Sequence, residues 1–511
     1  MRNQENEKNL KGQIDWVSII VPLIFVGAIF ILFMLCPSQS QAVLGAVRGF
    51  IGDDCGLYYA LLGVGILVCS ILIGFSKYGK IKLGDIEKPQ YSSFKWGTMI
   101  FTSTMAADIL FYSLCEWALY ANEPYIEQLG GIQKWASTFP LFHWGPIAWG
   151  FYIILAVAFG FMLHVRKHET QKFSEACRPL LGNRVDGFWG KMIDLFAIFA
   201  LLAGTATTFS LATPLLASAL SNVFGLPSGS ALTIMILLLI AVVYTLTVWF
   251  GMKGISRLAN VCSYLFFTLL IYFLILGGEA GYIFESGFSA VGNMVQNFIG
   301  MSTWMDPLRE TSFPQNWTIY YWSYWMAWCV ATPFFIGSIS KGRTVKNVIL
   351  GGYGWGLAGT FTSFIVLGNY GLAQQMKHGV NISGYIAEGG DISEAILRIF
   401  DTLPLSNIGL ILLVITMIAF YSTTFDALTM VVSSYSYKKL EVGREPDKKV
   451  RTFWAIMFIV LPIALIFADN SMYQLQSVSL IAAFPIGLII ILIIVSFFKD
   501  AKKYLKDKEK K

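Results

Sequence analysis

Charge is scarce in this sequence. Only 13% of its 511 residues are Asp, Glu, Lys or Arg, and 56% are hydrophobic, whereas a soluble globular protein carries about 25% charged residues. This deficit excludes a disordered chain, a nucleic-acid-binding module and an ordinary soluble enzyme of this length. It favours a single polytopic membrane domain, because only apolar segments are stable in hydrocarbon.

Metal-binding and nucleophilic residues are also scarce or scattered. The seven cysteines form no Cys-x-x-Cys pair, so neither a disulfide framework nor a zinc site is expected. His164 and His168 have a metal-binding spacing but stand at a basic boundary, where we expect no metal. No nucleophile–base pair converges in the apolar segments, so we expect a protein that is not an enzyme and has no cofactor.

Long apolar runs are abundant. Twelve of them have about 17–25 residues, enough to cross about 30 Å of hydrocarbon. They lie near 16–35, 57–75, 97–120, 141–164, 192–213, 231–250, 258–278, 317–339, 348–370, 407–430, 452–468 and 476–498.

The few basic residues are distributed unevenly between these runs. Of the 37 Lys and Arg, 32 fall in the two termini and the even-numbered connections. Positive residues favour the cytoplasmic side of a membrane, so we expect both termini to be cytoplasmic. One wrongly placed run would destroy this alternation, which supports the number twelve.

Four carboxylates lie within or near the ends of these runs: Asp108, Glu116, Asp194 and Asp426. No Lys or Arg stands inside a run to pair with them, and an unpaired charge in the membrane is costly. Each must therefore be protonated, hydrogen-bonded, or paired with a proton, a metal cation or a cationic substrate. Asp108 is the strongest functional candidate because it stands in the middle of its run.

Two runs contain small and hydroxyl residues that loosen a helix, at 101–110 and 420–426. Non-helical backbone at membrane depth is tolerated only where it lines a cavity, and carriers use such broken helices to bind ions and substrates. We therefore expect a helix break in both runs.

Aromatic residues make up 15% of the chain, including 15 Trp. In the eighth run, Tyr321, Trp325 and Trp328 have the spacing of one helix face, and the fourth run adds Trp144 and Trp149, with Tyr152 one turn on. Packing and an interfacial aromatic belt remain one explanation. The other is a cage for a quaternary ammonium, which has no hydrogen to donate and is attracted mainly by aromatic faces.

The eighth run also carries a recognisable motif. Residues 316–325 read Asn-Trp-Thr-Ile-Tyr-Tyr-Trp-Ser-Tyr-Trp, which resembles the signature of the betaine/carnitine/choline transporter (BCCT) family except that Tyr324 replaces a Trp. Residues 339–344, Ile-Ser-Lys-Gly-Arg-Thr, and 142–146, Phe-His-Trp-Gly-Pro, are also similar to family sequences. The resemblance covers essentially the whole chain.

The resemblance implies an all-α polytopic membrane protein with twelve transmembrane helices, built as a LeuT-like inverted repeat of 5+5 helices plus two N-terminal helices. It implies homotrimers, in which an interfacial amphipathic helix helps association. The implied segments are 1–95 (tail and two peripheral helices), 96–282 (first repeat), 283–316 (interfacial helix), 317–498 (second repeat) and 499–511 (basic cytoplasmic tail).

The resemblance also implies a central site. Family cage positions match Trp144, Trp149, Tyr152, Trp325 and Trp328, and we add Tyr321, Tyr324 and Asp108 as candidate substrate-binding residues. Departures at Leu119 and Ser338 reshape the site or its gate in ways that the sequence does not define.

The resemblance implies ion coupling through three features. Sodium-coupled members use carbonyls of the broken third helix and hydroxyls of the tenth, and the matching residues here are Thr102, Met105, Phe420, Thr423 and Thr424, with possible sodium at Thr423 and Thr424. Cys262 stands where sodium-independent exchangers have an Arg. Asp108 replaces the last Gly of a Gly-x-Gly-x-Gly pattern and is similar to the proton-coupled choline carriers.

The sequence therefore predicts a secondary transporter in the cytoplasmic membrane of a prokaryote, importing a quaternary ammonium compound such as choline or glycine betaine with a proton or sodium gradient. The alternatives are a carnitine/butyrobetaine-type exchanger and a ligand sensor that does not transport.

Overall fold

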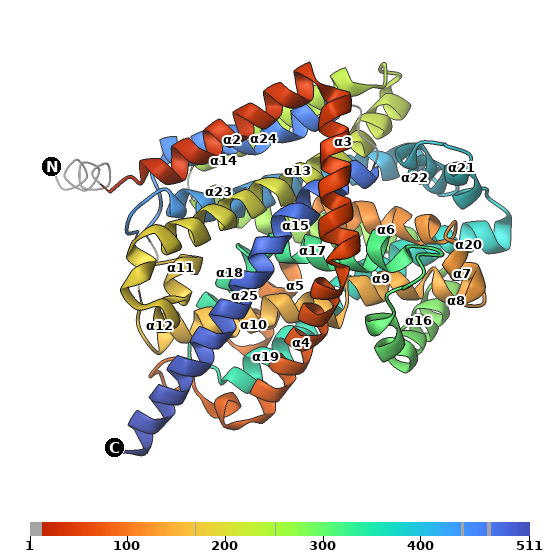
Figure 1. Ribbon diagram of the computed structural model, residues 1–511. Helices are drawn as coiled ribbons and strands as arrows, with labels where there is room; N and C mark the ends of the chain where they lie inside the picture. The colour runs from red at the N-terminus through yellow and green to blue at the C-terminus, as the bar shows by residue number, and fades with distance from the viewer. Residues whose placement is uncertain (1–12, 169, 251, 441–443, 468–471, 511) are drawn as a thin grey trace.

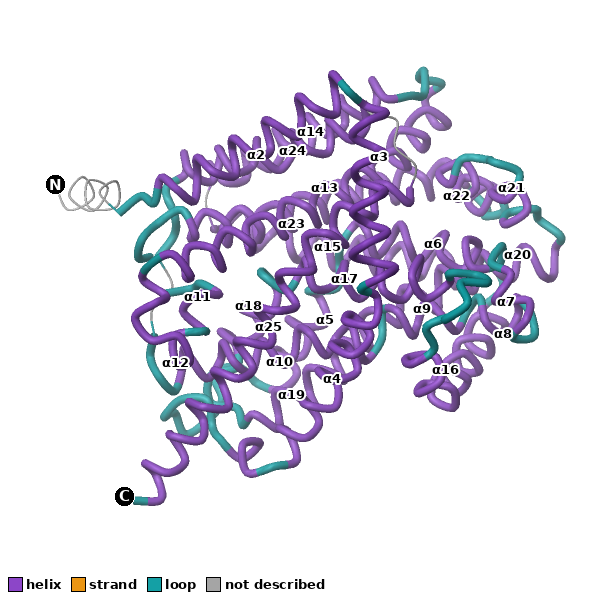
Figure 2. Tube along the Cα trace, viewed as in Figure 1, coloured by secondary structure: helices purple, strands orange, loops and turns teal. Residues whose placement is uncertain are grey.

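The protein is an all-helical bundle. The structure, a computed structural model, describes residues 13–168, 170–250, 252–440, 444–467 and 472–510. The described residues form helices joined by loops, with two isolated backbone bridges in place of strands. The helices lie side by side in one elongated body (Figures 1 and 2). This confirms the predicted all-α class, in which every helix satisfies its own backbone hydrogen bonds in hydrocarbon.

Eight described helices are long and apolar enough to cross a membrane, or up to ten if each of two bent pairs is one span. Each of the twelve predicted runs falls on helix in its described part; residue 468, at the end of the eleventh run, lies outside the described residues. Two of the twelve runs are not among these ten candidate spans. The sixth run forms a shorter apolar helix, and the eighth forms an interrupted helix. The helices carrying the runs are α2 (Trp16–Leu35), α4 (Gly56–Phe75), α5 (Ser93–Thr102) with α6 (Ala107–Tyr120), α9 (Thr138–His143) with α10 (Pro146–His164), α13 (Phe188–Phe224), α14 (Ser230–Phe250), α15 (Met252–Leu276), α17 (Ile319–Trp328) with α18 (Thr332–Ile339), α19 (Val345–Ser363), α23 (Ser406–Tyr435), α24 (Lys448–Phe467) and α25 (Met472–Glu509).

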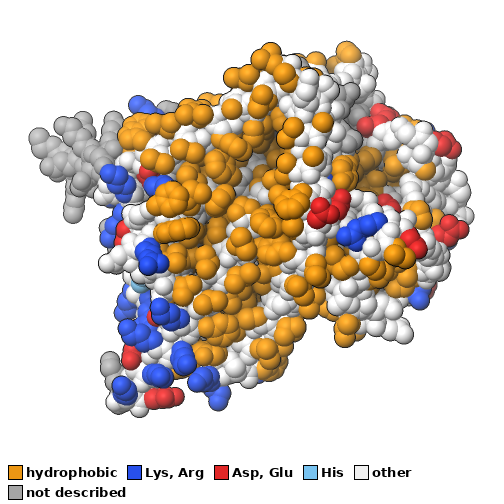
Figure 3. Space-filling model, viewed as in Figure 1, with side chains coloured by type: hydrophobic (Ala, Val, Ile, Leu, Met, Phe, Trp, Pro, Cys, Tyr) orange, Lys and Arg blue, Asp and Glu red, His pale blue; other side chains and the backbone are white. Residues whose placement is uncertain are grey.

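The two ends of the bundle differ in charge. Lys and Arg gather at the end where α2 begins and α25 ends, and a broad apolar band covers the middle of the visible face (Figure 3). The short helices of the predicted outer connections lie at the opposite end (Figure 1). These helices are α7 (Pro124–Gln128), α8 (Ile132–Trp135), α20 (Asn369–His378), α21 (Ser383–Ala387) and α22 (Ile392–Asp401).

α16 (Ala280–Thr303) is bent by 113° from the preceding helical segment Asn260–Leu276. Its buried side packs on α9 and α20, while Phe288 and Ile299 are exposed. It covers part of the segment for which the sequence predicts an interfacial helix, and its position in a membrane stays a prediction.

The third run is broken, as the sequence predicts. α5 and α6 are inclined by 66° to one another across residues 103–106. The hydroxyls of Ser103 and Thr104 bond back to the carbonyls of Ile100 and Phe101, which lets them close the end of α5 and compete with continued helix.

The eighth run is broken as well, between α17 and α18 at residues 329–331. This break was not among the predicted ones. Its local signal is Pro333 in the first turn of α18, because Pro is favoured at the start of a helix and disrupts a helix interior. The two broken runs are the first helices of the two predicted repeats.

The break expected at 420–426 is wrong. α23 continues through it without interruption for 30 residues. The hydroxyls of Ser422 and Thr423 donate to the carbonyls of Ile418 and Phe420 on the same helix. Carbonyls of the same helix accept the hydrogen bonds of these hydroxyls, so the hydroxyl-rich sequence does not interrupt the helix.

Candidate functional site

A cavity of about 830 Å³ lies between the two broken runs and helices α10, α13 and α23. Asp108, Trp144 and Trp149 form buried parts of its lining, whereas Lys95 and Asn260 are exposed lining residues. Lys95 lies near the start of α5, and Asn260 lies in the first part of α15. Both residues are at the basic end of the bundle. The cavity therefore opens toward that end.

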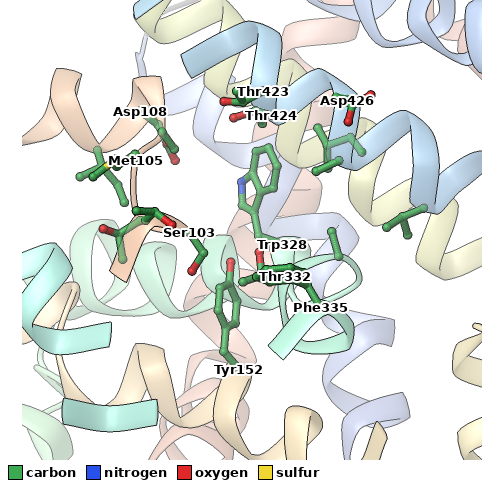
Figure 4. Close-up of a pocket in the computed structure, with 18 of the residues that line it drawn as sticks. Ser103, Met105, Asp108, Tyr152, Trp328, Thr332, Phe335, Thr423, Thr424 and Asp426 are labelled. Carbon is green, nitrogen blue, oxygen red and sulfur yellow. The ribbon is translucent and has the colours of Figure 1, made fainter. Parts of the chain in front are cut away.

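Ten aromatic residues line the cavity, and five of them are the predicted cage residues Trp144, Trp149, Tyr152, Trp325 and Trp328. Trp325 is the centre of the group, with ring centroids 5.7 Å from Trp144, 5.5 Å from Trp149 and 4.7 Å from Tyr152. The ring planes are inclined by 59–68° to Trp325, so they form adjoining walls and not a parallel stack. Trp328 lies one turn further along α17, and Figure 4 shows its indole between Tyr152 and the hydroxyls of α23.

α19 holds one of these walls in place. Gly356 lies so close to Trp149 that a Cβ there would be 2.5 Å from the indole ring. The indole nitrogen of Trp149 donates to Thr360 Oγ1 at 3.4 Å, and Thr360 donates to the backbone carbonyl of Trp144 at 3.0 Å. The Gly-rich sequence of the ninth run thus allows α19 to approach the aromatic walls.

Asp108 lines the cavity from the first turn of α6. Tyr324 Oη donates a hydrogen bond to Asp108 Oδ2 at 2.6 Å and also contacts Thr208 Oγ1 on α13. The ion pairs found among the described residues do not include Asp108. Its charge is therefore met by a hydroxyl from another helix and not by a basic side chain.

Thr208 is a site residue that the sequence analysis missed. It lies in a hydroxyl-rich stretch of α13, Thr205 to Ser210, and four of these hydroxyl residues are buried. Hydroxyls concentrated in one membrane helix are a signal of a polar neighbour, and here that neighbour is Tyr324.

Four of the five candidate sodium ligands line the cavity: Thr102, Met105, Thr423 and Thr424. Phe420 does not line it, and its carbonyl accepts a hydrogen bond from Thr423 Oγ1 at 3.0 Å. Cys262 Sγ lies 4.0 Å from Thr423 Oγ1, so the position matched to an exchanger arginine does adjoin the candidate sodium ligands.

Tyr321 lies outside the lining of the cavity. Its ring stacks on His143, with centroids 5.2 Å apart, and also contacts Trp144. The helical spacing predicts Tyr321 on the same face as Trp325, but in the folded bundle its ring packs against His143 and not into the cavity.

Two of the carboxylates that the sequence left without partners are paired. Asp426, which lines the cavity, forms an ion pair with the buried Arg451 of α24. Asp194 lies 3.6 Å from Lys172 Nζ and accepts from the backbone N–H of Ser174. Arg451 stands one residue before the eleventh run and Lys172 lies in the connection between the fourth and fifth runs, so neither basic residue is part of a run interior.

The fold and the site together define a class: a polytopic membrane protein with an aromatic central cavity between two broken helices. The sequence profile of the BCCT family, described as betaine/carnitine/choline family transporter, matches residues 17–506. The chain belongs to that family and is a membrane transporter.

One similar solved structure is described as the substrate-bound outward-open state of a Na⁺-coupled sialic acid symporter. It shares 15% sequence identity with this chain, covers 88% of it and 87% of its own chain, and has a TM-score of 0.43.

Proposed function

We propose that this transporter is a secondary carrier that imports a quaternary ammonium compound such as choline or glycine betaine, driven by a proton or sodium gradient. The observation that carries the proposal is the set of inclined aromatic walls around Trp325 in a cavity of about 830 Å³. Cation–π attraction contributes about 2 kcal/mol for each desolvated ring, and it is the main specific contact available to a cation without N–H donors.

The indole nitrogens of Trp325 and Trp328 support the same proposal. Neither has a hydrogen-bond partner among the described residues, although both are buried. A buried donor without an acceptor is unfavourable. The hydroxyl of choline or the carboxylate of a betaine supplies such an acceptor.

Asp108 favours choline over a zwitterion. An ionised Asp108 attracts the net positive charge of choline, whereas the carboxylate of glycine betaine is repelled by it. The same carboxylate is the candidate site for a coupling proton, because a group in the cavity is exposed alternately to the two sides as the carrier changes conformation.

Sodium coupling is supported by a different set of residues. The hydroxyls of Thr423 and Thr424 and the broken backbone around Met105 are hard oxygen ligands. Exchange without a gradient is the less favoured mode, because the thiol of Cys262 supplies no positive charge beside Thr423. A sensor that binds the same ligand without transport is distinguished by testing accumulation in proteoliposomes.

We place the carrier in the cytoplasmic membrane of a prokaryote, with both termini in the cytoplasm and the basic end of the bundle inside. The cavity in this structure then faces the cytoplasm. We also propose a homotrimer, in which the exposed apolar side of α16 contributes to the contact between subunits.

The substrate is tested by competition binding with choline, glycine betaine, carnitine, butyrobetaine and proline betaine. Trp325→Leu, which keeps an apolar side chain but removes the aromatic face, is expected to weaken binding about 30-fold, the equivalent of about 2 kcal/mol. Trp325→Phe is the matched control and retains most of the affinity. Equal binding by the Leu and Phe variants contradicts the cage.

Coupling is tested by measuring uptake into proteoliposomes under imposed proton or sodium gradients. Asp108→Asn cannot exchange a proton, so proton-driven accumulation is expected to disappear while substrate exchange continues. Thr423→Ala is the comparison variant and lowers only sodium-driven uptake. Proton dependence that survives in Asp108→Asn rules out the proton role of Asp108.

A further inference from the structure

A second buried acidic group lies behind the aromatic wall. Glu116 of α6 does not line the cavity and is fully buried. Its Oε2 accepts a hydrogen bond of 2.7 Å from the indole nitrogen of Trp144, and Trp144 does line the cavity. Of the two side chains that hydrogen-bond to Glu116 in the described part of the chain, Tyr120 and Trp144, Trp144 is the one that lines the cavity.

A chain of hydrogen bonds leads from Glu116 toward the closed end. Tyr120 Oη lies 2.5 Å from Glu116 Oε1 and 2.6 Å from His143 Nδ1. His143 Nε2 lies 2.9 Å from Thr318 Oγ1. His143, like Glu116, is completely buried.

This chain is satisfied in two protonation states. With Glu116 ionised, Tyr120 donates to the carboxylate, His143 Nδ1–H donates to Tyr120, and Thr318 donates to Nε2. With Glu116 protonated, all three bonds reverse: Glu116 donates to Tyr120, Tyr120 donates to Nδ1, and Nε2–H donates to Thr318. One added proton therefore changes the charge of Glu116 while all three hydrogen bonds of the chain are kept.

The surroundings of Glu116 contain no competing cation. In the described chain, no Lys or Arg lies within 4 Å of it, and His143 Nδ1 is 4.0 Å from Oε1. The ionisable side chains that face it are Cys115 and Tyr120 of α6, His143 of α9, and two from α17, Tyr320 and Tyr321.

We propose that Glu116 is a second proton-binding site, separate from Asp108, and that its charge sets how strongly Trp144 attracts a cationic substrate. An ionised carboxylate that accepts the indole N–H polarises the bond and makes the ring face more negative, which strengthens cation–π attraction. Protonation of Glu116 removes this effect. The inference rests on the proposed function, because its readout is cation binding in the aromatic cage.

The test measures binding of tetramethylammonium, which offers a cation and no other polar group, to the purified full-length protein as a function of pH. The starting variant is Asp108→Asn, which removes the titration of the other cavity carboxylate. Its affinity is expected to fall about fivefold as the pH is lowered. The double variant Asp108→Asn/Glu116→Gln is expected to show no such change, because Gln still accepts from Trp144 but does not titrate.

A second variant covers the case in which Glu116→Gln does not fold. Trp144→Phe in the Asp108→Asn background keeps an aromatic face but removes the indole N–H. It is expected to bind more weakly and without the pH dependence.

The infrared C=O band of a protonated carboxyl group gives a readout that packing alone does not produce. On acidification this band is expected to grow more in Asp108→Asn than in the double variant, and the difference between the two proteins is the contribution of the Glu116 carboxyl group. A pH dependence of binding that survives both Glu116→Gln and Trp144→Phe overturns the inference alone. No binding of tetramethylammonium to the wild-type protein at any pH overturns the proposed function and this inference together.

Discussion

Tyr324 and Asp108 are two of the positions at which the sequence departs from the family pattern, and they contact each other. Their hydrogen bond of 2.6 Å joins α17 to α6 across the cavity. A Trp at position 324 has a ring nitrogen in another place, and a Gly at 108 has no acceptor. The two departures therefore form one unit, in which the Tyr324 hydroxyl donates a hydrogen bond to the Asp108 carboxylate.

A double-mutant cycle tests this unit. Tyr324→Phe removes only the hydroxyl, and Asp108→Ala removes only its acceptor. Because a hydrogen bond to a charged group contributes about 1.5–3 kcal/mol, Tyr324→Phe is expected to weaken choline binding by about tenfold or more in the wild-type background. In the Asp108→Ala background the same change is expected to have little effect. Equal losses in both backgrounds show that the two residues act independently.

At the level of helices, the Gly-rich ninth run matters because one of its faces meets the aromatic walls. Gly356 of α19 touches Trp149, whereas a Cβ at Gly354 meets nothing within 4 Å. Two glycines of the same helix thus differ in whether the space beside them is filled.

Gly356→Ala is expected to displace the Trp149 ring and to weaken choline binding about tenfold, because overpacking costs about 1–3 kcal/mol. Gly354→Ala is the matched control and leaves binding unchanged. Binding isotherms and thermal unfolding of both variants in detergent separate a local effect on the cage from a general loss of stability. Unchanged binding in Gly356→Ala indicates that α19 does not position Trp149.

A second pair of elements is joined outside the membrane spans. Glu279, which precedes α16, accepts from Lys377 Nζ at 2.5 Å and contacts His378 Nε2 at 2.8 Å, both on α20. The hydrogen bond from Lys377 is the main cause that lowers the pKa of the Glu279 carboxyl below its ordinary value, and His378 adds to it. A carboxyl whose pKa falls on folding stabilises the fold above its unfolded pKa and loses this effect as the pH drops through the folded pKa.

Glu279→Gln is therefore expected to reduce thermal stability at pH 7 by about 1 kcal/mol or less, because Lys377 is partly exposed to solvent. The difference from wild type shrinks as the pH falls to about 4 and below. Glu388→Gln, an exposed position on the same side, is the control and shows no such trend. A constant difference across this range contradicts a charge-dependent contact.

For the molecule as a whole, the cavity is open at one end and sealed at the other. Beyond the aromatic walls, the hydroxyls of Tyr112 and Tyr320 share a hydrogen bond of 2.8 Å. The hydrogen-bonded chain of Glu116 and Tyr120 lies at the same end. A carrier that alternates between two sides must rearrange this closed end. The structure therefore represents the state that faces the basic end.

Cysteine labelling tests that state. Asn260→Cys is expected to react with a membrane-impermeant maleimide added from the basic side, and bound choline is expected to slow the reaction. Leu308→Cys, on an exposed loop, is expected to react from the opposite side at a rate that choline does not change. The wild-type protein controls for its natural cysteines. Labelling of both positions from the same side contradicts the proposed orientation.

Local patterns were sufficient for much of this architecture. Hydropathy and the distribution of basic residues predict the helical membrane class and the places of the twelve runs, because each run must be apolar along its own length. Small residues around 103–106 predict the break before Asp108. The aromatic residues of the fourth and eighth runs predict six of the ten aromatic residues that line the cavity. Indole side chains deep inside a membrane helix are unusual, because an aromatic belt lies at the membrane interface.

Contacts between distant segments required the folded chain. The partner of Asp426 is Arg451, 25 residues away on the next helix, and the hydroxyl that meets Asp108 comes from position 324. The continuity of α23, the turn of Tyr321 away from the cavity and the network around Glu116 are similar cases. Each depends on which side chains from other helices occupy the neighbouring space, and the spacing of residues along one helix carries no information about that.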